Sequence, residues 1–409
     1  MKKRFLGILA GVWICAGLCG GCSPNPDNEA PVEQENVEVQ TKSVSEGNTD
    51  YQVKYLSMSQ AEKEQVSEKL LAVTEKCRPI FEQADKGGAS NVVLEEAAVH
   101  EMAKAAAADG IPVTCGEHDL NMHNYEMVDS ELQKARKSED AETEFYVIDA
   151  NGMFRYYCFQ FEEGKMSLTF AGAVIEEGPV IQQMEKIQPY QWEYTEKGWL
   201  IWEKALSRNQ EMDMHVFCRI LPLDEKCREI TEKYIAPVGY TDSNLFLVDW
   251  DENSRQQIVF NDLFDSLYRM ETGSSPDPNT YAEGVPKEKF EETILQHFDM
   301  KAEELEQYGA YDPEKGVYPW YAVGPRNQIQ RTSPMPEVVK CVENEDGTLS
   351  IYVEAVFIQI GKDCAFRHVV TAREEDGKWI YLGNQIDWEE AYTVPAYKAR
   401  KKYTERKTL

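Results

Sequence analysis

The feature that most constrains the fold is a change in the spacing of apolar residues near residue 140. Over residues 57–137, apolar side chains recur every three or four positions, which is the period of amphipathic α-helices. Beyond that point they alternate with polar residues or form short runs around turns, of which Asp149-Ala-Asn-Gly152 is the first. Helices followed by hairpins predict an α+β fold with antiparallel β-meanders, because an α/β fold would alternate helices with strands.

The first half of the chain is predicted to place its helices before its strands. The expected helices cover 57–81, about 92–108 with Ser90 as the N-cap, and 125–137. The expected strands cover 145–148, 154–161, 166–174, 190–194 and 199–202. The segment between the third and fourth of these strands is expected to be helical or irregular.

The second half repeats these ingredients. Helices are expected at 224–234, 261–270 and 286–308, where Pro286 suits a first helical turn. The expected strands form a hairpin of 245–250 with 256–260 and then a meander of 337–342, 349–360, 364–372 and 379–382. The charged turns at Gly198 and Gly377, each before a strand that contains Trp, are similar in kind.

The N-terminal residues 1–21 follow the plan of a secretory signal peptide. Basic residues at positions 2–4 precede an apolar run, 5–18, that is too short to span a bilayer as a helix. Gly20-Gly21-Cys22 then resembles the lipobox of bacterial lipoproteins, whose cysteine carries diacylglycerol and becomes the mature N-terminus. This resemblance makes Cys22 the predicted lipid attachment site, although Cys19 stands where leucine is common. An ordinary secretory signal is the alternative.

The residues that follow predict a tether and a membrane address. Residues 22–54 are polar, acidic and nearly free of large apolar side chains, so they cannot bury enough surface to offset the entropy of ordering. Two acyl chains on one cysteine give stable attachment. We therefore expect a lipid-anchored protein on the extracytoplasmic side of the cell membrane. The expected domains are an N-terminal α+β domain at 55–205, a C-terminal α+β domain at 206–395 and a basic tail at 396–409.

Charge and cysteine content exclude several classes of partner. The formal net charge of −29 argues against a nucleic-acid partner, because binding to phosphates needs clustered Lys and Arg. Seven of the ten cysteines lie beyond Cys22, and an odd number leaves at least one thiol unpaired. Disulfides between Cys341 and Cys364, or between Cys218 and Cys227, are conceivable. Among these seven cysteines, no CxxC or Cys/His spacing predicts zinc, and no cofactor or metal is expected.

No familiar catalytic motif occurs in the sequence. Glu96 and His100 lie four residues apart and can face one way on a helix, but a solvated pair is favoured over metal ligation. His118, Asp119 and His123 share a polar loop and are the candidates for an unfamiliar acid–base site. No catalytic residue is assigned on this basis.

Aromatic residues are the better candidates for binding. Tyr190, Trp192 and Tyr194 alternate and so share one strand face, where they would stack on sugar rings if exposed. Trp320 lies in an aromatic loop, and it is either a binding residue or a buried core residue. The basic tail can contact polyanions or lipid head groups, although a frayed terminus is favoured.

Three stretches outside the tether resemble a group of uncharacterised clostridial-type, Gram-positive surface lipoproteins. They are Gly110-Ile-Pro-Val-Thr with Asn121-Met-His-Asn-Tyr125, the segment from Val285-Pro-Lys-Glu-Lys-Phe290 to Phe298-Asp299, and Tyr311-Asp-Pro-Glu-Lys-Gly-Val-Tyr-Pro-Trp320 with the C-terminal meander. The resemblance implies an envelope context and brings no chemistry.

The leading functional prediction is a non-enzymatic, membrane-anchored lipoprotein that binds an envelope protein or a cell-wall glycan or other wall polymer. One alternative is a cell-wall-directed hydrolase with an unrecognised site, in which His118, Asp119 and His123 would converge in a pocket. The other is a transporter substrate-binding lipoprotein, which predicts alternating strands and helices and a parallel sheet.

Overall fold

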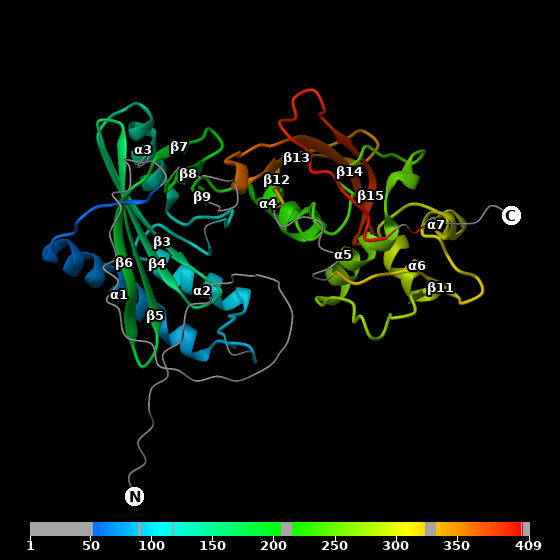
Figure 1. Ribbon diagram of the computed structural model, residues 1–409, viewed down its shortest axis with the longest axis horizontal. Helices are drawn as coiled ribbons and strands as arrows, with labels where there is room; N and C mark the ends of the chain where they lie inside the picture. The colour runs from blue at the N-terminus through cyan, green and yellow to red at the C-terminus, as the bar shows by residue number, and fades with distance from the viewer. Residues whose placement is uncertain are drawn as a thin grey trace, which may run out of the picture. The chain divides into compact units, whose positions relative to one another are not determined.

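The computed structural model describes residues 52–88, 91–116, 118–205, 215–323, 333–401 and 403. These described residues belong to one compact unit, in which helices accompany several antiparallel sheets (Figure 1). The predicted α+β fold is confirmed. Cys22 and the signal peptide lie outside the described residues, and the division into two domains stays a prediction.

A six-stranded sheet organises the first half of the chain in the order β1-β6-β5-β4-β3-β2. Neighbouring strands are antiparallel except for β2 and β3, which run parallel. The strands are β1 (Lys54–Tyr55), β2 (Val113–Thr114), β3 (Ala141–Ile148), β4 (Phe154–Glu162), β5 (Lys165–Ile175) and β6 (Pro179–Gln188). The β3–β4 hairpin therefore forms around Asp149-Ala-Asn-Gly152 as predicted.

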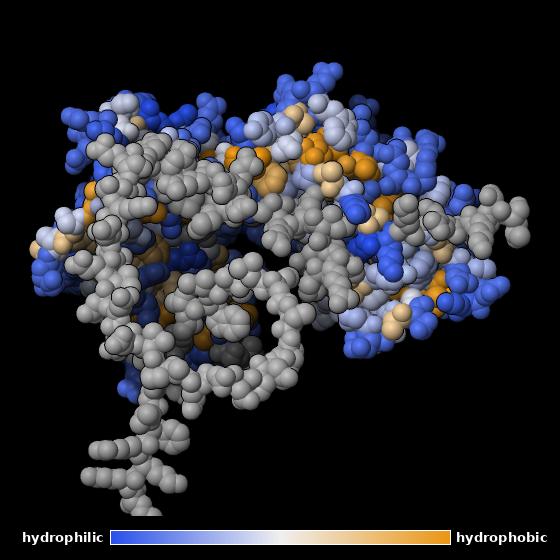
Figure 2. Space-filling view, viewed as in Figure 1, coloured by the Kyte–Doolittle hydropathy of each residue, from blue (hydrophilic) through white to orange (hydrophobic). Residues whose placement is uncertain are grey.

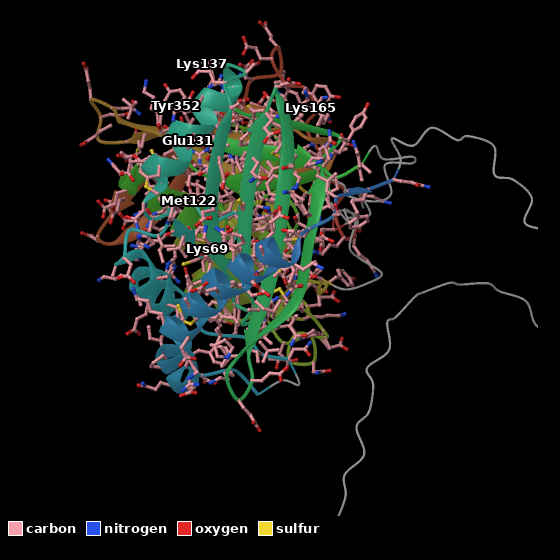
Figure 3. All side chains as sticks on the ribbon, turned by 90° about the vertical axis from the view of Figure 1, so that its left-hand side faces the viewer. Lys69, Met122, Glu131, Lys137, Lys165 and Tyr352 are labelled. Atoms are coloured by element: carbon pink, nitrogen blue, oxygen red, sulfur yellow. The ribbon has the colours of Figure 1, made fainter. Side chains whose placement is uncertain are left out.

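Both faces of this sheet are covered. Successive side chains of a strand point to opposite faces, so those of each central strand enter two different cores. Tyr146 and Tyr156 pack beneath α1 (Gln60–Gln83) and α2 (Glu96–Ala107). Figure 3 looks onto this face, where α1, which carries Lys69, crosses the strands obliquely. Phe145 and Tyr157 point the other way.

The opposite face packs against a helix and a small antiparallel sheet. The helix is α3 (Tyr125–Arg136), and the small sheet holds β7 (Gln191–Tyr194), β8 (Trp199–Glu203) and β9 (His215–Arg219). Val128 and Leu132 of α3 and Leu200 and Trp202 of β8 are buried in one cluster with Phe145.

The second half of the chain packs helices on a four-stranded meander, β12-β13-β14-β15. Its largest core joins this sheet to α5 and α6 through side chains such as Phe264, Phe290 and Tyr381. The helices are α4 (Glu225–Ile230), which continues as a π-helical turn over Thr231–Ile235, α5 (Phe260–Thr272), α6 (Lys287–Leu295) and α7 (Ala302–Tyr308). The strands are β10 (Val285–Pro286), β11 (Val317–Tyr318), β12 (Met335–Glu343), β13 (Leu349–Val356), β14 (Arg367–Glu375) and β15 (Lys378–Ile386).

The second helix begins at Glu96 with Glu95 as its N-cap, and the predicted N-cap Ser90 lies outside the described residues. Three further expectations are wrong because a tertiary contact replaces the local pattern. The segment expected to be helical or irregular contains β6, which pairs with β5. The hairpin expected between 245–250 and 256–260 does not form, since Trp250 instead bonds to Asn384 of β15 and Phe260 begins α5. The expected 286–308 helix breaks into α6 and α7, because the carbonyl of His297 accepts a hydrogen bond from the backbone of β15.

The C-terminal segment predicted as a frayed basic tail is packed where it is described. The side chain of Arg400 is 3% exposed and forms ion pairs with Asp265 and Asp262 of α5. The hydroxyl of Tyr397 donates to the carboxylate of Asp262 at 2.8 Å. The expectation fails here because α5 buries carboxylates that need a cation.

A buried ion cluster joins the small sheet β7–β9 to the C-terminal meander. The carboxylate of Glu337 on β12, 1% exposed, lies 2.8 Å from the ammonium of Lys197 and 2.9 Å from the guanidinium of Arg219. Lys197 also pairs with Glu354 of β13 at 2.7 Å. Trp199 and Phe217 pack against Val356 beside these charges. The resulting junction forms one side of the cavity described next.

Candidate functional site

A cavity of about 790 Å³ lies at this junction. One wall comes from α2, the loop after β2 and the β3–β4 turn, and the other comes from the segment after α4 and the start of β12. Apolar side chains such as Trp199 and Val356 contribute to the lining, together with a set of carboxylates. A cavity of this size with few convergent polar groups is a typical small-ligand site.

Three side chains on the first wall, those of Cys115, His100 and Glu96, form a continuous series of contacts. The Sγ of Cys115 lies 3.4 Å from Nδ1 of His100, and Nε2 of His100 lies 3.4 Å from a carboxylate oxygen of Glu96. Glu96 and His100 share a face of α2 because they are four residues apart. Cys115 follows β2, the strand that comes directly after this helix. The short connection thus brings the thiol back to the helix.

The loop that carries Cys115 is held by one carboxylate. Asp119 accepts hydrogen bonds from the backbone N–H of Cys115 at 2.9 Å and from the hydroxyl of Thr114 at 3.0 Å. It also accepts from the backbone N–H of Asn121 at 3.2 Å. Gly116 has φ +104°, which only glycine adopts easily, and a Cβ there would meet nothing within 4 Å. The chain therefore turns sharply beside the thiol and leaves open space next to it.

The electrostatics of the wall keep the thiol protonated in the absence of a ligand. The pKa of Cys115 is raised to about 12, chiefly by burial and to a smaller extent by the carboxylates of Asp119 and Glu96. Burial also raises the pKa of the Glu232 carboxyl on the opposite wall. The carboxylates of Asp119 and Glu96 contribute to this rise. The positive charge of Arg228 opposes this rise in the pKa of Glu232, and His100 does so to a smaller extent.

The cavity brings together part of the predicted acid–base set. His118 and Asp119 line it, whereas His123 is not among its lining residues and instead pairs through its backbone with Val113. The expected convergence of all three side chains is thus not observed. Asp119 serves the loop by binding backbone N–H groups.

The aromatic candidates do not form an exposed platform. Tyr194 is buried, and its hydroxyl donates to Asp129 at 2.7 Å. Trp192 is half-buried against Phe161, with ring centroids 4.6 Å apart, and Tyr190 remains exposed. Most of the residues coloured in Figure 2 are hydrophilic, and hydrophobic residues gather over β13 and β14.

Trp320 is a core residue. It is 5% exposed, and its indole N–H donates to Asp265 at 2.8 Å. The rings of Trp320 and Tyr194 are therefore unavailable to a ligand, because both are buried and stabilise the core. Of the predicted aromatic set, Tyr190 and Trp192 retain accessible surface.

None of the seven cysteines of the described residues forms a disulfide, so both of the conceivable pairings are absent there. Cys77, Cys158, Cys218 and Cys227 are buried, and Cys115, Cys341 and Cys364 are partly exposed. Within the described ranges, no group of three or more His, Cys, Asp or Glu side chains is placed to hold a metal ion. Cys115 is distinguished by the imidazole beside it.

A family model matches residues 63–400, which is most of the chain and includes every wall of the cavity. The chain belongs to the DUF6070 family. DUF6070 is described as a family of unknown function, so membership assigns no activity to the cavity. No curated protein and no solved structure is detectably similar to the chain. In the part of this DUF6070 member that the structure describes, no helix is long and apolar enough to cross a membrane.

The Cys115–His100 pair is the feature that sequence reasoning missed. The spacing of Glu96 and His100 was visible, but a cysteine fifteen residues downstream of His100 gives no motif by itself. The only local signal was Cys115-Gly116 after a short apolar segment. The pairing depends on β2 lying beside β3 in a parallel register, which no periodicity in the sequence predicts.

Proposed function

We propose that this chain is a lipid-anchored lipoprotein on the extracytoplasmic face of a Gram-positive cell membrane, and that it binds an envelope protein or a cell-wall polymer. The N-terminal sequence pattern around Cys22 supports the anchor and the location. The single observation that supports binding is the cavity of about 790 Å³ at the junction of β8 and β12. We place the ligand there.

The charge of the cavity wall narrows the chemistry of the ligand. Glu96, Asp119 and Glu232 all line the cavity, and the first two disfavour the ionised form of Glu232, so a positive charge that enters the cavity meets a set of acidic side chains. The nearby guanidinium of Arg155 is bound by Asp149, at 2.6 Å for one of its hydrogen bonds. The proposed ligand therefore carries an amine or guanidinium group together with an apolar part that contacts Trp199 and Val356.

The anchor is tested by fractionating cells that express the full-length chain or a Cys22→Ala variant. The expected result is recovery of the wild type in the membrane fraction and release of the variant. Equal distribution of the two proteins would contradict the lipid anchor and would leave the cavity proposal untouched.

Binding is tested by crosslinking the full-length protein in intact cells and recovering what is attached. A matched pair of variants locates the ligand. Ala236→Trp places a large ring in the cavity from an exposed lining position, and Met127→Trp places the same ring on the exposed face of α3 outside the cavity. We expect a specific protein or polymer with the wild type and Met127→Trp, and its loss with Ala236→Trp. Equal recovery with both variants would place the ligand elsewhere.

The two alternatives differ in their support. The β2–β3 pair is the one parallel pairing between named strands of the described residues, and it does not favour the transporter-binding alternative. The hydrolase alternative gains a specific observation in Cys115 and His100, although these are not the residues predicted for it.

A further inference from the structure

We propose that Cys115 is an acyl-accepting nucleophile and His100 its general base, acting on an ester, thioester or amide carbonyl of the ligand. This inference rests on the proposal that a ligand enters the cavity, and it goes beyond binding. It stands on the geometry of three side chains on one wall, of which Glu96 is the third.

The orientation of the imidazole suits this role. The carboxylate of Glu96, whose side chain is 86% exposed, lies 3.4 Å from Nε2 of His100, and its negative charge weakly favours a proton on that nitrogen. Nδ1 then presents a lone pair to the thiol, 3.4 Å away. A nucleophile, a base within hydrogen-bond reach and a carboxylate that orients the base form the arrangement that activates side chains for acyl transfer. Glu96 acts through His100 and is a positioning residue.

The state of the thiol explains why a base is required. Cys115 is protonated at neutral pH, since burial and the neighbouring carboxylates raise its pKa. The thiol proton must therefore be removed as the sulfur attacks the carbonyl carbon. Nδ1 of His100 lies beside the thiol and can accept that proton. Of the other partly exposed cysteines in the described ranges, Cys364 donates its thiol to the backbone carbonyl of Phe366 at 3.7 Å.

Water is the only other reactant that the proposed reaction needs. Nδ1 of His100 takes the thiol proton as Sγ bonds to the carbonyl carbon. The bond from that carbon to its O, S or N leaving group breaks, and the leaving group receives the proton from His100. Water then attacks the thioester and passes a proton to His100, and the carboxylic acid departs as Sγ recovers that proton. Gly116, the residue after Cys115, has open space where a Cβ would stand, and both residues line the cavity that would admit the carbonyl.

The test uses the full-length chain in detergent with p-nitrophenyl acetate as the acyl donor. Release of nitrophenolate is followed together with mass spectrometry of each cysteine peptide. We expect Cys115 to be acetylated, and His100→Ala to slow this acetylation about a hundredfold. Acetylation of Cys341 serves as an internal control and should not change, and Cys341→Ala should leave the reaction of Cys115 intact.

Two results would overturn the proposal. One is acetylation of Cys115 at the same rate in the wild type and His100→Ala. The other is wild-type Cys115 reacting no faster than Cys341.

Glu96→Gln, which keeps an oxygen to accept from Nε2, should retain more activity than Glu96→Ala; equal loss in both would remove the positioning role. Capture of a ligand by His100→Ala would show that binding persists even if the chemistry fails.

Discussion

Single buried charges decide much of the stability of this chain, and Arg400 is the clearest example. Its guanidinium contacts Asp265 and donates to the backbone carbonyls of Asp242 at 2.9 Å and Tyr321 at 3.1 Å. Truncation would leave the carboxylate of Asp265 buried without its cation. We expect Arg400→Ala to lower the free energy of unfolding by about 3–5 kcal/mol.

Urea unfolding of the full-length chain measures this loss. The matched control is Lys401→Ala, since Lys401 is exposed and its ammonium lies 4.2 Å from the ring centroid of Tyr321. That change should alter stability by less than about 0.5 kcal/mol. Equal effects at the two positions would mean that the C-terminal segment does not pack on α5.

A second prediction at this scale concerns His368, whose imidazole is buried between two partners. Its Nε2 lies 2.8 Å from the hydroxyl of Tyr240 and its Nδ1 lies 2.6 Å from Asn384. Burial lowers the pKa of His368 to about 4. The unfolded chain takes up a proton below about pH 6.5 that the folded chain does not, so this group's contribution to stability is lost as pH falls from about 6.5 to about 4.

The size of this effect is up to about 3 kcal/mol. Urea unfolding of the wild type and His368→Gln across this pH range isolates it from the titration of carboxylates that both proteins share. The stability advantage of the wild type should shrink as the pH falls. A constant difference between the two proteins would contradict the prediction.

At the scale of elements, two similar turns test how local conformation and packing combine. Gly198 has φ +88° and Gly377 has φ +74°, so alanine is strained at both. A Cβ at Gly198 would lie 2.4 Å from Cβ of Leu221, whereas one at Gly377 would meet nothing within 4 Å. We expect Gly377→Ala to cost about 1 kcal/mol and Gly198→Ala to cost 1–3 kcal/mol more.

Thermal or urea unfolding of the two variants gives this comparison directly. The backbone strain is common to both, so the excess at Gly198 reports the contact with Leu221. Equal losses would show that Leu221 moves aside freely and that the β7–β8 turn is not tightly packed.

The sequence predicted elements well where the pattern was local. The alternation in β3 and β4 and the turn between them were readable, and so were the helical spacing of α1 and α3 and the meander β12–β15. β6 was missed because its side chains are mostly half-exposed and lack a clear alternation. The pair of Cys115 and His100 was missed for a related reason, since it depends on where β2 joins the sheet rather than on spacing along the chain.

At the scale of the whole described unit, the ion cluster at Glu337 couples the small sheet β7–β9 to the C-terminal meander. Lys197 and Arg219 both depend on its carboxylate. We expect Glu337→Ala to lower the free energy of unfolding by about 3–5 kcal/mol, because the buried guanidinium of Arg219 loses its carboxylate partner. The partly buried ammonium of Lys197 keeps its ion pair with Glu354. Amide hydrogen exchange should accelerate in both β8 and β12.

The control for this prediction is Glu343→Ala, which removes an exposed carboxylate from the end of the same strand. It should change stability by less than about 0.5 kcal/mol. Faster exchange confined to β12 in Glu337→Ala would show that the cluster stabilises one strand and does not couple the sheets.

The central claim is that the cavity beside Cys115 receives the ligand of this protein. The most direct test is the rate at which iodoacetamide alkylates each cysteine of the full-length chain, with and without an extract of the cell envelope. We predict that the extract slows alkylation of Cys115, which lines the cavity, and leaves Cys341, which does not, unchanged. Equal rates at Cys115 with and without the extract would contradict the claim.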